Sequence, residues 1–188
     1  MKKISSLLFL LSTTLMISCG GETLPKPKGM LRLAYPVPEY ASVALDCPYS
    51  FDKNEIAQLK KAIRNRKCWY NLEYPKLKAT IYLSYFEVNN NLDSLLRDAQ
   101  NLTQEHVVKA DGITQEPYVN LEKKVYGMFY EVTGDAASQS QFYVTDSSHH
   151  FLSGSLYFKV KPNYDSILPA AHYLREDVKR LMETIEWK

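Results

Sequence analysis

The stretch VYGMFYEVTGDAASQSQFYVTDSSHHFLSGSLYFKV, from Val125 to Val160, decides the fold. Its first part, Val125 to Val132, is apolar at odd and even positions alike, which predicts a central strand covered on both sides. Thr133-Gly134-Asp135 has the composition of a turn, and Gln139 to Val144 predicts a neighbouring strand. Phe151 to Val160 then alternates with a period of two. Consecutive strands joined by short turns predict an antiparallel sheet.

Further strand patterns lie upstream of this stretch. Lys78 to Phe86 places apolar residues at its odd positions and mostly polar ones at its even positions, which predicts a strand with one face in the core. Met30 to Ala34 and Trp69 to Tyr74 give weaker strand predictions.

Amphipathic helices flank the predicted strands. Apolar residues recur every three or four positions from Leu92 to His106 and again from Ile167 to Ile185. A shorter third helix is predicted over Asn54 to Arg66. The expected N-terminal caps are Asn90 or Asn91 for the first helix and Asp165 or Ser166 for the helix near the C-terminus. Because these helical stripes need a sheet to pack on, the sequence predicts an α+β fold, an antiparallel sheet sandwiched by helices. The order of its elements resembles the PsbP-like fold.

The first nineteen residues have the pattern of an export signal. Met1-Lys2-Lys3 is basic, Ile4 to Ile17 is mainly apolar, and Ser18-Cys19 follows. The apolar run is shorter than the roughly 20 residues that span a bilayer. The ending resembles a bacterial lipobox, in which the chain is cut before the cysteine and the thiol takes up diacylglycerol. Residues 1–18 are therefore predicted to be a lipoprotein signal peptide and Cys19 the lipidated residue. The alternative is an ordinary signal peptide cut elsewhere.

Removal of the signal peptide changes the charge balance. Lys2 and Lys3 are the charged residues of the first eighteen, and they account for the formal net charge of +2. The remaining chain is formally neutral, so composition gives no support for nucleic-acid binding. Residues 19–29 contain Pro25 and Pro27 and are predicted to be a lipid-anchored tether. A single α+β domain is expected over residues 30–188.

Two cysteines remain after Cys19. Cys47 and Cys68 form an even pair in an exported chain, which favours a disulfide in an oxidising compartment. Two buried free thiols are the alternative.

Catalytic signatures are absent from the sequence. It contains no HExxH, GxSxG, P-loop or GxGxxG motif. His149 and His150 are adjacent, and neighbouring strand residues point to opposite faces, so a shared metal would need a turn with Asp146. His106 lies on an apolar helix stripe, where a core histidine is expected. We therefore expect no enzyme activity, no cofactor and no metal.

Two clusters are candidates for an interaction surface. The basic residues form one dense cluster that could face anionic lipid or an acidic partner, or could form a solvated helix face. They are Lys60, Lys61, Arg64, Arg66 and Lys67. The aromatic residues Trp69, Tyr70 and Tyr74, with Tyr82, Tyr85 and Phe86 nearby, could serve an interface or pack in the core, since rings with a polar tip suit both.

Several motifs resemble one known family. They are the Cys19 lipobox, Pro25 to Gly29, Cys47 to Phe51, YPKLKATIYLSY from Tyr74 to Tyr85, Val125 to Gly127, Thr145 to Ser147, Gly154 to Phe158, Pro162-Asn163, Arg175 to Asp177 and Leu181 to Thr184. Together they are similar to the GldD gliding-motility lipoproteins of Bacteroidota. Asp52 to Lys67 and Gly112 to Glu122 do not take part in the match.

The resemblance implies a non-enzymatic envelope lipoprotein required for gliding and type IX protein secretion. It implies an outer-membrane anchor, on the periplasmic side, and other envelope proteins of that apparatus as partners. A periplasmic domain that binds a lipid, glycan or peptide is the alternative. The resemblance also marks Ser94 and Ser166, each between Asp and an apolar residue, as O-glycosylation candidates; a helix-starting role is the alternative.

Overall fold

The computed structural model describes residues 34–62, 66–105, 108–160 and 163–188. The predicted signal peptide, Cys19, the tether and the residues Arg64 and His106 lie outside this part of the chain, as does the strand predicted from Met30, apart from Ala34. The chain divides into two units, 1–30 and 31–188, and every described residue belongs to the second.

Within the described residues there are ten strands, two α-helices and one short 3-10 helix. The strands are β1 (Tyr40–Val43), β2 (Tyr49–Asn54), β3 (Gln58–Lys61), β4 (Tyr70–Tyr74), β5 (Ala79–Glu87), β6 (Ala110–Asn120), β7 (Val125–Gly134), β8 (Ser138–Thr145), β9 (His150–Phe158) and β10 (Glu186–Trp187). The helices are η1 (Pro75–Leu77), α2 (Leu92–Gln104) and α3 (Tyr164–Thr184).

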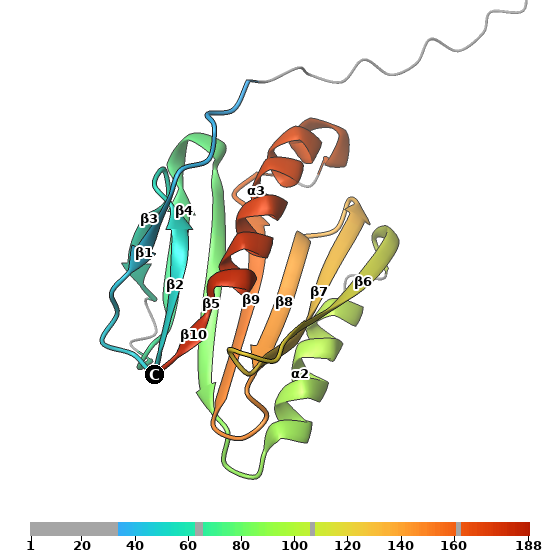
Figure 1. The fold of residues 1–188 in the computed structure, drawn as a ribbon. Coiled ribbons are helices and arrows are strands. Elements are labelled where there is room, and N and C mark those ends of the chain that lie inside the picture. The colour runs from blue at the N-terminus through green and yellow to red at the C-terminus, as the bar shows by residue number, and fades with distance from the viewer. Residues whose placement is uncertain (1–33, 63–65, 106–107, 161–162) are drawn as a thin grey trace, which may run out of the picture. The chain divides into compact units, whose positions relative to one another are not determined.

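The strands form two sheets (Figure 1). Seven strands make the larger sheet in the order β3-β4-β5-β9-β8-β7-β6, and the smaller has the order β1-β2-β10. Every neighbouring pair is antiparallel. The predicted α+β class with an antiparallel sheet is therefore confirmed, whereas the likeness to the PsbP-like fold stays a prediction.

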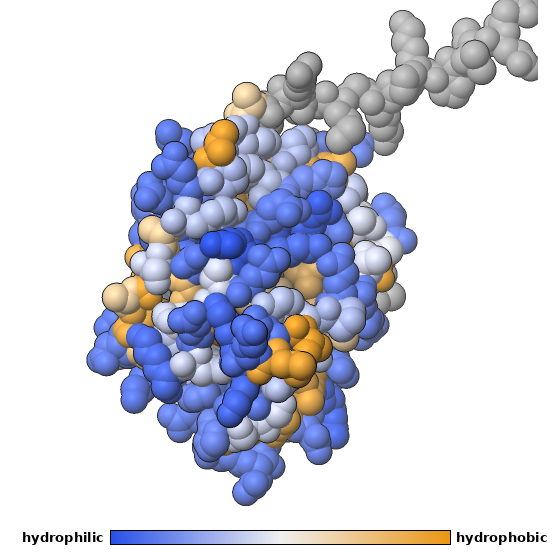
Figure 2. Space-filling model, in the orientation of Figure 1, coloured by the Kyte–Doolittle hydropathy of each residue, from blue (hydrophilic) through white to orange (hydrophobic). Residues whose placement is uncertain are grey.

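The two helices cover opposite faces of the larger sheet (Figure 1). On one face, α3 and the small sheet enclose the main core, in which Leu174 of α3 meets Phe142 and Leu152 of β8 and β9. On the other face, α2 packs Leu95 against Tyr143 and Phe151 in a smaller cluster. The face of the molecule that carries α3 and the small sheet is largely hydrophilic, with apolar residues only in small separate groups (Figure 2).

The strand β7 is covered on both sides, as predicted, but it is not central. Phe129 packs in the α3-side core and Tyr130 in the α2-side cluster. The order of the sheet nevertheless places β7 next to the edge strand β6. A strand apolar on both faces needs two covering layers, and helices can supply these even near a sheet edge.

The helix predicted over Asn54 to Arg66 is wrong. Asn54 ends β2, and the amide N–H of Ile56 donates to its side-chain Oδ1 over 3.2 Å, which begins a turn. The chain then crosses to the larger sheet, where β3 pairs with β4 and Leu59 lies opposite Leu72. Leu59 packs against the main core from this edge position, so strand pairing outweighs the helical spacing.

The start of α3 is fixed from a distant turn. Asn163 is its cap residue rather than Asp165 or Ser166, and it makes no side-chain cap hydrogen bond. The amide N–H of Tyr164 instead donates to Asp135 Oδ1 over 2.8 Å. Helix α2 starts after Asn91, one of its two predicted caps, also without a side-chain cap hydrogen bond. The turn before Asp135 contains Gly134 at φ +95°, as its composition predicts.

Candidate functional site

A cleft opens at the end of the larger sheet where β5 ends and β9 begins. It has a volume of about 660 Å³, within the range of ligand and peptide sites. We call it the end cleft. Its lining residues are Pro48, Arg66 to Trp69, Tyr85 to Asn89, His149 and His150.

One wall of the end cleft is the segment that leads into β4. Its Cys68 is joined to Cys47 by a disulfide, with Cα atoms 5.6 Å apart. The hydroxyl of Tyr49 donates to the Cys68 carbonyl over 2.9 Å. Cys68 has φ +63°, a left-handed conformation that costs energy for a residue with a Cβ. The disulfide and the hydrogen bond hold the wall in a conformation that the local sequence disfavours.

Trp69 lies on this wall, directly before β4. Its indole N–H donates to the carbonyl of Tyr85 over 2.7 Å, and its ring meets Phe86 edge-on at 5.3 Å. The guanidinium of Arg66 lies over the same ring, 4.9 Å from its centroid. This cation–π contact presents an exposed positive charge on a rigid aromatic base.

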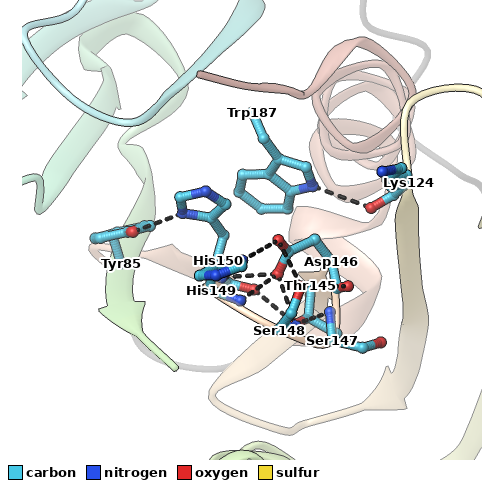
Figure 3. A network of polar contacts seen from close by, with 9 residues as sticks. All are labelled: Tyr85, Lys124, Thr145, Asp146, Ser147, Ser148, His149, His150 and Trp187. Atoms are coloured by element: carbon cyan, nitrogen blue, oxygen red, sulfur yellow. Dashed lines mark hydrogen bonds and ion pairs between the residues drawn. The ribbon is translucent and has the colours of Figure 1, made fainter. Parts of the chain in front are cut away.

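The opposite wall is the turn between β8 and β9 (Figure 3). The carboxylate Oδ1 of Asp146 accepts the backbone N–H groups of Ser148, His149 and His150 at 2.8 to 3.0 Å. Burial alone would raise the pKa of Asp146, but these hydrogen bonds outweigh it and lower the pKa to about 2. Ser147 has φ +69°, so the carboxylate stabilises a tight turn with a left-handed residue.

His150 joins this turn to the C-terminal strand. Its ring lies between Tyr85 and Trp187 (Figure 3). The Nδ1 atom is 2.8 Å from the Tyr85 hydroxyl, and the indole of Trp187 stacks on the imidazole at 5.2 Å. Trp187 in turn donates its indole N–H to the carbonyl of Lys124 over 3.1 Å.

The electrostatics favour a neutral His150. Burial lowers the pKa of His150, and it is the largest contribution, opposed by the charge of Asp146. Burial also raises the pKa of Tyr85 to about 12, with smaller contributions from Glu87 and Asp146. Tyr85 therefore keeps its proton, and its hydroxyl shares a hydrogen bond with Nδ1 of the neutral ring. The pair is a structural link rather than a proton-transfer site poised near neutral pH.

Binding is the chemistry that these walls support best. Arg66 and Lys67 are exposed cations, and the side chain of His149 is 76% exposed. Among the described residues no group of three His, Cys, Asp or Glu could hold a metal ion. The hydroxyl of Ser148 contacts the carboxylate of Asp146 at 3.2 Å. Within the described chain no serine hydroxyl bonds a histidine ring, as a Ser-His-Asp triad would require.

The structure separates the residues of the predicted interaction surface. Trp69 lies in the end cleft, whereas Tyr70 and Tyr74 are 9% and 2% exposed and pack in the main core. Tyr70 is therefore a core residue, whereas Tyr74 also lines a hollow beside η1. Lys60 and Lys61 are exposed on β3, outside the cleft, and Lys60 pairs with Glu73 at 2.6 Å.

Several residues of the end cleft belong to the two clusters recognised in the sequence, but their meeting was not predicted. They are Arg66, Lys67, Trp69, Tyr85 and Phe86. Tyr85, His150 and Trp187 come from three separate elements, and only the fold brings them together. A local signal existed in Asp146-Ser147-Ser148, the composition of a side-chain-capped turn. It places His149 in the turn and His150 at the first position of β9, but the carboxylate that a shared metal site would have used accepts backbone N–H groups.

A second hollow lies beside η1. It has a volume of about 670 Å³, and its walls are mostly apolar. Its lining residues are Ala34 to Pro36, Ile56, Gln58 and Tyr74 to Leu77. No helix in the described part of the chain has the length and apolar character needed to cross a bilayer.

These features define the class of the protein: a disulfide-bonded α+β domain whose rigid end cleft presents cations and aromatic rings. A family model described as "Gliding motility lipoprotein GldD" matches residues 20–187. The chain therefore belongs to the GldD family of gliding motility lipoproteins, and the resemblance drawn from its sequence motifs is confirmed. Membership makes it a membrane-anchored envelope lipoprotein connected with gliding motility. No curated protein matches the chain.

Proposed function

We propose that this protein is a non-enzymatic lipoprotein at the periplasmic face of the outer membrane. In this proposal it supports gliding motility and type IX protein secretion by binding other envelope proteins of that apparatus. The observation that carries it is the end cleft, in which Arg66 lies over the Trp69 ring 4.9 Å from its centroid. Family membership supplies the link to motility.

The chemistry of the end cleft suits a protein partner with acidic groups. Tryptophan and arginine are the residues in which interface binding energy concentrates, because a fixed ring and a planar cation lose little entropy on binding. Trp69 is already held by its hydrogen bond to Tyr85, so it needs no further ordering. The cations Arg66 and Lys67 outnumber the one acidic residue of the lining, Glu87. A carboxylate-bearing loop is therefore the expected occupant.

The polar groups of the cleft support a non-enzymatic role. The carboxylate of Asp146 is engaged by three backbone N–H groups, and His150 by the Tyr85 hydroxyl. Groups used in this way to fix a turn are poorly placed to activate a nucleophile.

The proposed location at a membrane depends on a lipid anchor at Cys19. Cys19 precedes the matched domain and would hold it at a membrane through a lipid on its thiol. Replacement by Cys19→Ala should release the protein into the soluble fraction of disrupted cells. Protease treatment of intact cells should leave the wild-type protein uncut, and digestion from outside would place it on the outer surface instead.

Charge reversal in the cleft tests the proposed interaction. A deletion strain complemented with the Arg66→Glu, Lys67→Glu double variant should lose most colony spreading and most secreted cargo. The matched control is Lys61→Glu with Lys109→Glu, which makes the same charge change at exposed sites outside the cleft. A photo-crosslinking amino acid at position 149 should also capture a component of the motility or secretion apparatus.

The controls decide between binding and general damage. Both double variants should accumulate to wild-type amounts and unfold at the same denaturant concentration as the wild type. Equal spreading and secretion in the two complemented strains would refute the cleft as the interaction site. Crosslinks to no envelope component would refute the interaction itself.

Ligand binding is the second candidate function, favoured by the hollow beside η1. Its apolar walls include Tyr35, Ile56 and Leu77, which suit an acyl chain. A fluorescent fatty acid should bind the full-length protein, and Ile56→Asp should weaken this binding. Val119→Asp, an equal change at an exposed apolar residue elsewhere, is the control. Absence of probe binding would exclude this candidate.

A further inference from the structure

A small pocket with a mostly apolar lining and a few polar groups lies between α2 and the sheet face beneath it. Its volume is about 230 Å³, several times the roughly 30 Å³ that one water occupies in the liquid. It is separate from the end cleft, with Phe86 the one described residue that lines both. We call it the α2 pocket. Its other lining residues are Ser84, Leu95, Asp98, Ala99, Leu102, Thr103, Tyr130, Gln141 to Tyr143, Phe151 and Ser153 to Ser155.

A buried amide in this pocket lacks a partner. Gln141 is 3% exposed, and its Nε2 group has no hydrogen bond within the described chain. The other end of the amide, Oε1, accepts the hydroxyl of Thr103 over 2.8 Å. A single hydroxyl engages only one end of the amide, so the other end stays unpartnered in either orientation. A buried polar group without a partner costs about 1 to 3 kcal/mol, which a bound group would recover.

The sheet register gathers further polar groups at the same place. Gln141 of β8 lies opposite Ser155 of β9, and Ser155 lies opposite Tyr82 of β5. One step along, Ser153 of β9 lies opposite Ser84. Three serine hydroxyls, from Ser84, Ser153 and Ser155, thus line the pocket beside the free amide. Each hydroxyl can both donate and accept a hydrogen bond.

The rest of the lining is mainly aromatic and carries little charge. Phe86, Phe151 and Tyr143 supply apolar surface, and the rings of Tyr143 and Phe151 stack at 5.6 Å. Asp98 is the one charged residue of the lining, and no lysine, arginine or histidine is among the described residues there. An anionic ligand would meet no cation, whereas a neutral ligand with hydroxyl edges and apolar faces matches both kinds of wall.

We propose that the α2 pocket binds a neutral sugar residue, with Gln141 Nε2 donating to a ring or hydroxyl oxygen. A pyranose ring has hydroxyl groups around its edge and C–H groups on its faces, which suits serines and aromatic rings respectively. The pocket is smaller than the roughly 300 to 1,000 Å³ of sites for larger ligands, so it admits one sugar ring rather than a chain. This site does not depend on the interaction proposed for the end cleft.

Nuclear magnetic resonance on the full-length protein tests the proposal. The probes are glucose, galactose, mannose and N-acetylglucosamine at millimolar concentration, with glucuronic acid as the anionic comparison. At least one neutral sugar should shift the side-chain amide signal of Gln141 and the backbone signals of Ser153 and Ser155. Glucuronic acid should bind at least tenfold more weakly, as judged from the concentration needed to shift the same signals.

Two variants make the result decisive. Gln141→Leu removes the free amide and should weaken sugar binding at least tenfold. Leu102→Trp enlarges a residue that is 38% exposed at the pocket and should block binding without altering a buried polar group. Gln115→Leu, the same change at an exposed site of β6 outside the pocket, should bind as the wild type does.

Other outcomes overturn the proposal. No shift with any neutral sugar would refute it, because the pocket would then hold water alone. Equal sugar affinity in Gln141→Leu and the wild type would also refute it. If Gln141→Leu fails to fold, unchanged binding by the folded Leu102→Trp variant would refute it in the same way.

Discussion

The two faces of the larger sheet bury different polar groups, and within the described residues each also holds a buried hydroxyl without a partner, that of Ser140 on the α3 face and that of Thr80 on the α2 face. Under α3, the buried carboxylate of Asp177 accepts hydrogen bonds from Tyr40 at 2.7 Å and from Asn54 at 3.0 and 3.1 Å, and it bonds Tyr74 as well. On the α2 face, Thr80 is 1% exposed and its hydroxyl has no partner within the described residues, like the amide of Gln141.

The two faces therefore contribute differently to the stability of the domain. A satisfied buried network and a large apolar core tie α3, the small sheet and β4 into one unit. The α2 face has a smaller apolar cluster and retains buried groups that cost free energy. Because Ser140 on the α3 face is also unpartnered, this cost does not by itself distinguish the two faces; the α2 face differs in that its free amide, Gln141, lines a pocket.

Removal of one leucine from each face should give the largest contrast. Leu174→Ala should lower the free energy of unfolding by about 4 kcal/mol, because a fully buried side chain leaves a cavity under α3. Leu95→Ala in α2 should cost about 2 kcal/mol, since the smaller cluster can relax into the pocket. Denaturant unfolding measures both values. Equal losses would contradict the contrast between the faces.

Loss of the disulfide should come next. The Cys47→Ala, Cys68→Ala double variant should lose about 3 kcal/mol, because the bond closes a loop of about 22 residues in the unfolded chain. Hydrogen exchange should rise in β2 and in the wall of the end cleft, while α2 amides change little. Alkylation of the unreduced wild-type protein supplies the check, since modification at both cysteines would show that the bond does not form.

The sequence predicts the α2 face and the central strands better than it predicts the α3 face. The strands around Lys78 to Phe86 and Val125 to Val160 carry their period in consecutive residues, and their turns are local. The strand β6 was missed because it is an edge strand, mostly exposed, and contains Pro117, so it shows no alternation. The small sheet was missed because β10 is only two residues long.

The site was predicted least well because its residues are far apart in the sequence. Trp69 was found because aromatic clusters are visible in a sequence. The Tyr85–His150 hydrogen bond spans 65 residues, and Asp177 reaches Asn54 across 123. The Asp135 bond to the start of α3 spans 29. Contacts of this kind depend on topology, which no local pattern encodes.

The free energy of unfolding should depend on pH in opposite ways through the carboxylates of Asp146 and Asp177. The pKa of Asp146 is lowered to about 2, so its contribution of about 2 kcal/mol is present above pH 4 and is lost as the pH falls toward 2. Burial raises the pKa of Asp177, so stability from this group is highest at low pH and declines as the pH rises above about 4.

Unfolding of Asp146→Asn and Asp177→Asn from pH 2 to pH 7 measures these slopes. Asp146→Asn should flatten the acid limb of the wild-type curve. Asp177→Asn should remove the decline in the free energy of unfolding above about pH 4. The difference between this variant and the wild type should therefore change with pH in the direction opposite to that for Asp146→Asn. Parallel curves for the two variants would show that the carboxylates do not differ as the structure indicates.

The smallest effect tests the comparison most directly, because it should have opposite signs on the two faces. Thr80→Val replaces an unpartnered buried hydroxyl by a methyl group of similar shape, so it should raise the free energy of unfolding by about 0.5 to 1 kcal/mol. Tyr74→Phe removes a hydroxyl that bonds Asp177, so it should lower the same quantity by about 1 kcal/mol. Both changes delete one buried hydroxyl and retain the apolar packing. If both variants lose stability, the Thr80 hydroxyl has a partner in solution, and the expected difference in sign between the two variants does not hold.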